Sequence, residues 1–163
     1  MRIGGRIITS PYETIIGPIG GRYVYIDNTG KRVIEFGDDV DSADNFSEGL
    51  AGVGVRVKDY TRRGYIDKTG KFVIEPRFST AGDFSEGLAR IVLNPNFGFP
   101  FEGFGYIDRS GKIVLSFKYP TEYQMVNPFS GGMAAVEIEG TGYNTARFGY
   151  IDKTGRVIWP PSR

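Results

Sequence analysis

The chain contains no cysteine and no histidine among its 163 residues. Without thiols it can form no disulfide, no thiolate nucleophile and none of the usual structural zinc sites. Without imidazole it lacks the side chain that most often transfers protons near neutral pH. These absences exclude the commonest catalytic and metal chemistries, and we expect no catalytic residue, no metal and no cofactor.

An excess of charge of one sign is also missing. The chain has 20 basic and 19 acidic residues, and no basic run interrupts the balance. A net charge of +1 creates no field that would gather nucleic acid or anionic lipid. No apolar run reaches the length of a membrane span, and the first ten residues lack a signal-peptide core. We therefore expect a soluble protein with no nucleic-acid partner and no membrane insertion. The cytoplasm, or secretion after removal of a signal, both stay open.

Glycine and aromatic residues are abundant instead. The 24 glycines are about twice the usual share, which indicates many turns. Twelve phenylalanines and ten tyrosines supply much of the apolar volume. A chain of this length can bury a sizeable core, and we expect one domain over residues 1–163.

Two short patterns recur along the chain, about every 40 residues. The first, Tyr-Ile-Asp-x-Thr/Ser-Gly-Lys/Arg, occupies Tyr25–Lys31, Tyr65–Lys71, Tyr106–Lys112 and Tyr150–Arg156. The second, Phe-Ser-x-Gly-x-Ala, begins at Phe46, Phe84 and Phe129. We interpret them as four units near residues 12–45, 46–83, 84–128 and 129–163, with residues 1–11 as an N-terminal strand or cap.

Each unit is predicted to form three antiparallel strands, as at Leu88–Leu93, Phe104–Asp108 and Lys112–Leu115. The segment that follows the third strand contains Pro76, which a central strand does not tolerate, and we interpret it as an irregular crossover. The predicted fold is therefore all-β, a tandem repeat stacked as an open, twisted array. A small, closed four-bladed propeller is the alternative.

The Asp-x-Thr/Ser-Gly segment is typical of a tight hairpin turn. The aspartate accepts a hydrogen bond from the backbone two residues on, and the glycine takes a left-handed conformation. The predicted turn residues are Asp27, Gly30, Asp67, Gly70, Asp108, Gly111, Asp152 and Gly155. Two copies also spell Asp-Lys-Thr-Gly, the phosphorylated motif of P-type ATPases. We prefer the turn, because the other copies depart from that motif.

Other carboxylates were considered as sites. Asp38, Asp39, Asp41 and Asp44 cluster, but their spacing differs from a calcium-binding loop. Glu48 and Glu86 recur as a glycosidase pair might, yet the third copy has Gly131 at this position. We interpret the first group as a solvated loop and the second as structural turns.

The combined pattern, Phe-Ser-Glu-Gly-Leu-Ala, Gly-Tyr-Ile-Asp-x-x-Gly-Lys and Val-Ile-x-Pro-x-Phe, resembles the bacterial WG repeat over nearly the whole chain from Tyr23. The signature tryptophan is replaced, since Arg63, Phe104 and Phe148 stand before the glycine and the first unit has Arg22-Tyr23. The resemblance implies an accessory repeat module without enzymatic activity.

Three connections vary while the strands around them do not: residues 57–63, 94–102 and 139–147. In a repeat stack equivalent loops share one edge, and variation there marks a binding face. We predict that the protein is no enzyme and binds a protein partner through these loops. For Phe97, Phe99 and Phe101, folding back onto the sheet is an equal alternative. The candidate binding residues are Tyr60, Arg62, Arg63, Phe97, Phe99, Phe101, Tyr143 and Arg147.

Two further functions stay open. Exposed strands at the ends of the stack favour self-assembly by end-to-end pairing, with Trp159, Pro160 and Pro161 as a candidate guard. Carbohydrate binding on aromatic platforms such as Tyr60, Phe99 and Tyr143 is the least favoured.

Overall fold

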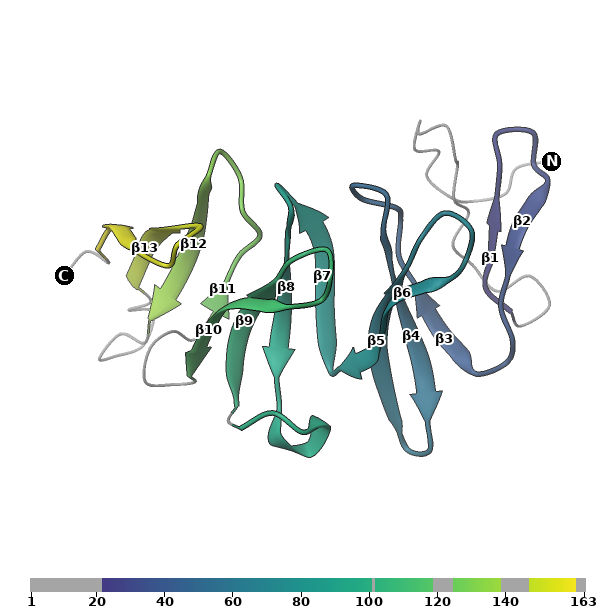
Figure 1. Cartoon of the computed structure of the whole chain (residues 1–163), viewed down its shortest axis with the longest axis horizontal. Coiled ribbons are helices and arrows are strands. Elements are labelled where there is room, and N and C mark those ends of the chain that lie inside the picture. Colours follow the sequence, from purple (N-terminus) through teal and green to yellow (C-terminus); the bar gives the residue numbers. More distant parts are fainter. Residues whose placement is uncertain (1–21, 101, 119–124, 139–146, 161–163) are drawn as a thin grey trace. The chain divides into compact units, whose positions relative to one another are not determined.

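The computed structural model describes residues 22–100, 102–118, 125–138 and 147–160, and it consists of antiparallel sheets (Figure 1). A two-stranded sheet is followed by three four-stranded sheets. The strands are β1 Val24–Ile26, β2 Arg32–Glu35, β3 Val40–Ala43, β4 Ala51–Val57, β5 Tyr60–Ile66, β6 Phe72–Phe78, β7 Thr80–Ser85, β8 Leu88–Leu93, β9 Gly103–Ile107, β10 Ile113–Lys118, β11 Met125–Val126, β12 Met133–Ile138, β13 Arg147–Asp152 and β14 Val157–Trp159, with one 3-10 helix, η1 Pro95–Phe97.

The all-β tandem repeat is confirmed, but each complete sheet has four strands rather than three. The added strand, β3, β7 or β11, comes from the segment expected to be an irregular crossover. Pro76 lies in β6, at the sheet edge, where a missing N–H breaks no ladder. In β7 a register shift between Ala81 and Phe84 interrupts the alternation of apolar residues, so the strand is hard to recognise in the sequence.

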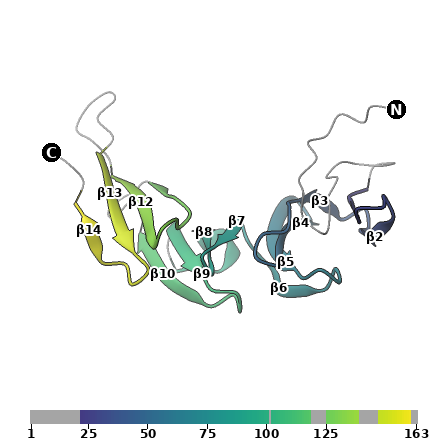
Figure 2. The same ribbon diagram turned by 90° about the horizontal axis from the view of Figure 1, so that it is seen from above.

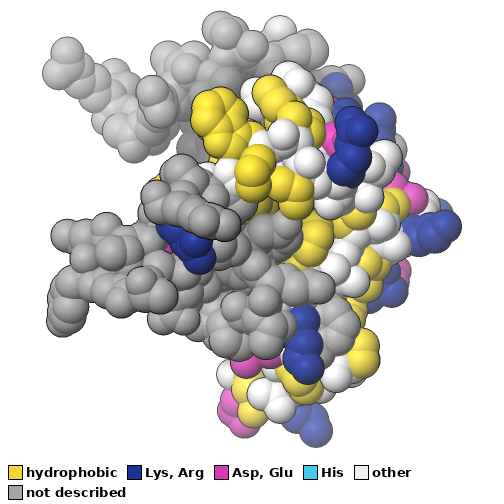
Figure 3. Space-filling view, turned by 90° about the vertical axis from the view of Figure 1, so that its left-hand side faces the viewer, with side chains coloured by type: hydrophobic (Ala, Val, Ile, Leu, Met, Phe, Trp, Pro, Cys, Tyr) yellow, Lys and Arg dark blue, Asp and Glu magenta, His cyan; other side chains and the backbone are white. Residues whose placement is uncertain are grey.

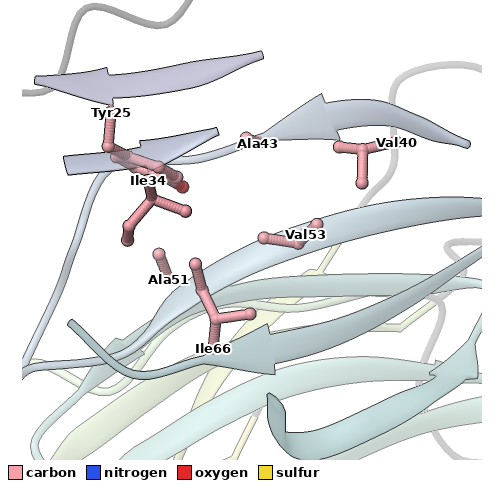
Figure 4. Packing of buried hydrophobic residues seen from close by; sticks show 7 residues of the cluster. All are labelled: Tyr25, Ile34, Val40, Ala43, Ala51, Val53 and Ile66. Atoms are coloured by element: carbon pink, nitrogen blue, oxygen red, sulfur yellow. The ribbon is translucent and has the colours of Figure 1, made fainter. Parts of the chain in front are cut away.

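The chain divides into two compact units, Met1–Pro76 and Arg77–Arg163. In the first unit, sheet β1-β2 packs on sheet β3–β6 through one cluster of buried side chains. Figure 4 shows Tyr25 and Ile34 of the small sheet beside Ala51, Val53 and Ile66 of the larger one. Alternate residues of β4 supply this core because successive side chains of a strand point to opposite faces.

The second unit repeats this arrangement with two four-stranded sheets, seen as successive layers in Figure 2. Tyr106 and Phe117 of sheet β7–β10 pack against Val126, Phe129 and neighbouring apolar residues of sheet β11–β14. No helix in the described part of the chain has the length and apolar character needed to cross a membrane.

Glycine precedes Tyr-Ile-Asp in the second, third and fourth copies, and in two of the sheets it has a packing reason. A Cβ at Gly64 would lie 2.4 Å from the carbonyl oxygen of Ile74, and one at Gly105 would lie 2.8 Å from that of Leu115. Backbone of the neighbouring edge strand occupies the space, so only glycine fits there.

Candidate interaction surface

All four Asp-x-Thr/Ser-Gly segments form the same turn. In each, one carboxylate oxygen accepts from the N–H two residues on at 2.8–2.9 Å, from the hydroxyl of that residue at 2.5–2.6 Å, and from the N–H four residues on at 3.0–3.2 Å. Gly30, Gly70, Gly111 and Gly155 have φ between +82° and +84°. These aspartates hold turns, and one oxygen of each carboxylate is already engaged.

Hydrogen bonding also lowers the pKa of these aspartate carboxyl groups. The hydroxyl of Thr29, Thr69 or Ser110, with backbone N–H groups, lowers the pKa of Asp27, Asp67 and Asp108. At Asp152 the Thr154 hydroxyl, backbone N–H groups and the Arg156 guanidinium lower the pKa to about 2. The carboxylates are therefore ionised at neutral pH, which suits an acceptor and excludes a general acid.

The four aspartates after β2 do not converge on one point, and Asp41 lies in β3 rather than in the loop that the sequence suggested. Asp38 pairs with Arg22 at 2.7 Å, Asp41 accepts from the Thr61 hydroxyl, and Asp44 pairs with Arg63. Within the described residues no three acidic side chains gather in a way that could hold a metal ion.

Glu86 connects the two sheets of the second unit. It has a left-handed backbone, with φ of +54°, and its carboxylate accepts from the N–H of Gly132 at 2.9 Å and pairs with Lys153 at 3.2 Å. The hydrogen bond from Gly132 lowers the pKa of Glu86. Glu48 has the same left-handed conformation in the equivalent turn, with φ of +51°. The arrangement at Glu86 is structural.

The first variable connection is shorter than the sequence suggests. β4 and β5 are joined by Lys58 and Asp59 alone, so Arg62 and Arg63 lie within β5 rather than in a loop. Arg63 extends across the sheet to Asp44, over the space left by Gly52, where a Cβ would lie 2.9 Å from its Nη2. Tyr60, at the hairpin tip, is 63% exposed.

The second variable connection, between β8 and β9, packs against Phe78, the last residue of β6. Asn94 caps η1 by accepting from the N–H of Asn96, and Gly98 ends the helix with φ of +86°. The ring of Phe99 then stacks on Phe78, with centroids 5.8 Å apart and an interplanar angle of 12°. Phe99 therefore packs against the protein's own chain, although against β6 and not against the sheet that the loop connects.

The other predicted loop residues contribute less to a surface. Phe97 ends η1 and is half-buried, and Arg147, half-buried, is the first residue of β13. Phe101 and Tyr143 lie outside the described residues. The six described candidates thus lie on different elements: Tyr60, Arg62 and Arg63 in β5, Phe97 in η1, Phe99 just after it, and Arg147 in β13.

In each unit, a tyrosine lies at the centre of the contact between the two packed sheets. Tyr25 and Tyr106 are 2% and 0% exposed. Their hydroxyls donate to the carbonyl oxygens of Asp44 at 2.7 Å and Asn127 at 2.5 Å, and their rings contact Phe46 and Phe129 of the next sheet. Burial raises the pKa of Tyr106, so its hydroxyl stays a donor.

In sheet β11–β14, the positions equivalent to these buried residues are exposed. Tyr150 is 41% exposed, and Trp159, its partner across β13 and β14, is 63% exposed. Phe148 lies two residues before Tyr150 on the same side and is 53% exposed, and Met133 of β12 is 40% exposed. We call Met133, Phe148, Tyr150 and Trp159 the terminal face.

The terminal face is an exposed apolar surface of the described residues. Figure 3, viewed from the C-terminal end, shows hydrophobic side chains grouped in its upper part, with several basic side chains at its right-hand side. More than half of the exposed large hydrophobic side chains belong to this sheet: Met125, Met133, Phe148, Tyr150, Val157, Ile158 and Trp159. Soluble proteins rarely expose large apolar patches that make no contact.

The pairing of strands shows that residues of the terminal face are equivalent to residues that lie between packed sheets in the rest of the chain. Trp159 pairs with Tyr150 as Leu115 pairs with Tyr106 and Ile34 with Tyr25. Counting back from the tyrosine of each Tyr-Ile-Asp, Tyr23-Val24 of the first unit is equivalent to Arg63-Gly64, so the Arg22-Tyr23 given for the first unit is displaced by one residue. Sequence reasoning missed the terminal face.

A family model described as "WG containing repeat" matches residues 25–56, 64–94 and 104–141, which together exceed half of the chain. The chain belongs to the WG repeat family. Each matched WG repeat begins near the Tyr-Ile-Asp strand and runs through the first two strands of the following sheet. One WG repeat thus contributes the last two strands of one sheet and the first two of the next.

No curated protein matches this WG repeat chain. Among solved structures, one titled "Crystal structure of puromycin hydrolase" is similar, with a TM-score of 0.50 and 15% sequence identity. The similarity covers 87% of the WG repeat chain but 24% of that structure, so the chain spans about a quarter of its length. At this identity the likeness concerns the fold alone.

Proposed function

We propose that this WG repeat chain is a non-catalytic module that binds protein and that the terminal face is its contact surface. The observation that carries the proposal is the exposure of Tyr150, Phe148 and Trp159 at positions that are covered in the inner sheets. Aromatic side chains of this kind dominate binding energy at protein interfaces.

The arrangement of the acidic groups supports a non-catalytic role. Each candidate carboxylate with a described partner is occupied by a turn, a salt bridge or a neighbouring backbone. Their pKa values, where shifted, are lowered, whereas an acid catalyst near neutral pH needs a raised one.

The edge of variable loops is the second candidate surface. It is favoured by Tyr60 and Val57, which are both exposed at the tip of the β4–β5 hairpin. Phe99 supports it less, because its ring stacks on Phe78. For the same reason Phe99 is a poor platform for a carbohydrate, and carbohydrate binding stays the least favoured function.

Site-specific photo-crosslinking tests the proposal. A photoreactive phenylalanine analogue is placed at Tyr150, at Tyr60 or at Val73 of the full chain, in cells that produce it. Val73 is an exposed apolar control on β6. We expect protein adducts from position 150 well above those from position 73. Adducts from position 60 alone would move the function to the loop edge, and adducts no stronger than the control at both positions would reject protein binding.

A further inference from the structure

Glu86 occupies a turn position that favours glycine. Together with Gly87 it forms the two-residue turn between β7 and β8, and the two residues have positive φ, +54° and +84°. The equivalent residue in sheet β11–β14 is Gly131, with φ of +61°. A left-handed backbone is unfavourable for a residue with a Cβ, and such strain persists where the surrounding structure holds the residue in place. The side chain of Glu86 therefore needs a reason to be in this turn.

Contacts with sheet β11–β14 supply that reason. Oε2 of Glu86 accepts from the N–H of Gly132 at 2.9 Å and lies 3.2 Å from Nζ of Lys153. The same Nζ donates to the backbone carbonyl oxygen of Glu86 at 2.8 Å. Gly132 lies in the turn before β12, and Lys153 lies in the turn between β13 and β14. One residue of the first sheet is thus bonded to two separate turns of the second.

These bonds have a direction that the apolar contact lacks. Tyr106, Phe129 and their neighbours exclude water between the sheets, but the hydrophobic effect is not directional. Hydrogen bonds depend on angle as well as distance, and those to an ionised group are about twice as strong as neutral ones. The side chains of Glu86 and Lys153 are 31% and 41% exposed, so water screens their attraction only in part. Polar contacts at this margin therefore set the angle between the two sheets.

We infer that Glu86 and Lys153 are positioning residues, which hold sheet β11–β14 in one orientation on sheet β7–β10. The inference does not depend on the proposed protein-binding function. It also gives a role to the second position of the Asp-x-Thr/Ser-Gly turn, which differs between copies. Lys153 uses that position to bind the other sheet, whereas Arg109 at the same position has no ion pair among the described residues.

Residual dipolar couplings of the full chain measure the orientation. In the unmodified chain, amide couplings from β8–β10 and from β12–β13 should fit one alignment tensor with the sheets placed as in the structure. Glu86→Gly and Lys153→Met should each require separate tensors for the two sheets. Lys153→Arg keeps the cation and should retain the common tensor. Arg109→Met, at the same turn position, is the matched control and should retain it as well.

Urea unfolding separates the use of the side chain from the relief of strain. Glycine relaxes a left-handed turn, so Glu86→Gly would stabilise the fold if the carboxylate were idle. We expect instead that it raises the equilibrium constant of unfolding by about 5-fold or more, because it removes hydrogen bonds to a charged group. Lys58→Gly is the matched control, since Lys58 has φ of +57° in the turn between β4 and β5 and its side chain is exposed. It should leave the constant unchanged within about 2-fold, or lower it.

A third measurement uses the unmodified chain, so that a variant that misfolds does not decide the outcome. The hydrogen bond from Gly132, with the contact to Lys153, lowers the pKa of Glu86, and its carboxyl titration by NMR should have a midpoint below the ordinary 4.5. A midpoint at or above 4.5 would overturn the inference. One common tensor in Glu86→Gly and Lys153→Met would overturn it whatever their stability, and so would a Glu86→Gly variant as stable as the unmodified chain. Equal effects of Lys153→Met and of either Lys153→Arg or Arg109→Met would do so too.

Discussion

Sheets β7–β10 and β11–β14 have the same strand order and the same hairpin turn, but they differ in what covers them. Tyr106 of the first is fully buried, while Tyr150 of the second is 41% exposed. Nothing in the local sequence, Gly-Tyr-Ile-Asp in both, accounts for the difference. In a repeat protein the environment of a residue depends on the sheet that packs against it.

The same comparison explains why one short motif can serve stability in one sheet and recognition in another. Tyr106 contacts Phe117 and Phe129 and donates to the carbonyl of Asn127. Its neighbours Ser85 and Arg90 also donate to backbone carbonyls of the following sheet, at 2.7 Å and 3.4 Å. The covered face thus combines apolar packing with polar contacts that fix the orientation of the next sheet.

The largest expected effect comes from removing the buried ring. Tyr106→Ala should lower the free energy of unfolding by about 3 to 5 kcal/mol, because it leaves a cavity between the two sheets and an unpaired carbonyl. Tyr150→Ala should cost about 1 kcal/mol or less in dilute solution, since the ring is partly in water. Urea denaturation at low protein concentration measures both. Similar losses at the two positions would contradict the distinction between a covered and an open face.

A smaller effect is expected at the loop between β8 and β9. Phe99→Ser removes the ring stacked on Phe78 and should lower the free energy of unfolding by about 1 to 2 kcal/mol. The matched change in the first unit is Tyr60→Ser, at the exposed tip of the β4–β5 hairpin, which should alter it by no more than about 0.5 kcal/mol. Thermal unfolding of both variants tests the pair. If Phe99→Ser is neutral, this loop contributes nothing to the core and becomes available for binding.

Much of the fold could be predicted from repetition alone. The copies of Tyr-Ile-Asp-x-Thr/Ser-Gly define the hairpins because the turn depends on local groups, an aspartate side chain and a glycine. The strand β7 could not be predicted in this way, since its register shift breaks the alternation on which strand recognition depends. β7 forms because it pairs with β8, and that pairing depends on backbone hydrogen bonds rather than on a pattern of side chains within β7.

The candidate site was less predictable, because exposure is a property of neighbours rather than of sequence. Arg63 is a charged residue of the kind that loops and interface rims contain. Its side chain is nevertheless only 17% exposed and is paired with Asp44. Phe99 has the character of a contact residue, yet its ring stacks on Phe78 at the end of β6. Trp159 was interpreted as a guard beside Pro160, and the structure leaves it 63% exposed on the terminal face.

The smallest expected difference between the two sheets lies in their turns and depends on pH. Hydrogen bonds lower the pKa of both Asp108 and Asp152, with the largest contributions from the hydroxyls of Ser110 and Thr154. Asp152 also accepts from Nε of Arg156 at 3.1 Å, and its pKa falls from the ordinary 3.8 to about 2. A lowered carboxylate pKa stabilises the folded state fully above the unfolded value and loses that contribution as pH falls through the folded value.

The contribution of Asp152 should therefore be complete above about pH 4 and should disappear between about pH 4 and pH 2. Carboxyl chemical shifts followed by NMR should give Asp152 a titration midpoint near 2. Thr154→Ala should move that midpoint toward 3.8, because it removes the largest cause of the shift while the Arg156 contact remains. The same substitution should leave the midpoint of Asp108 unchanged, since that turn depends on Ser110. A midpoint near 3.8 for Asp152 in the unmodified chain would show that the turn hydrogen bonds do not persist in solution.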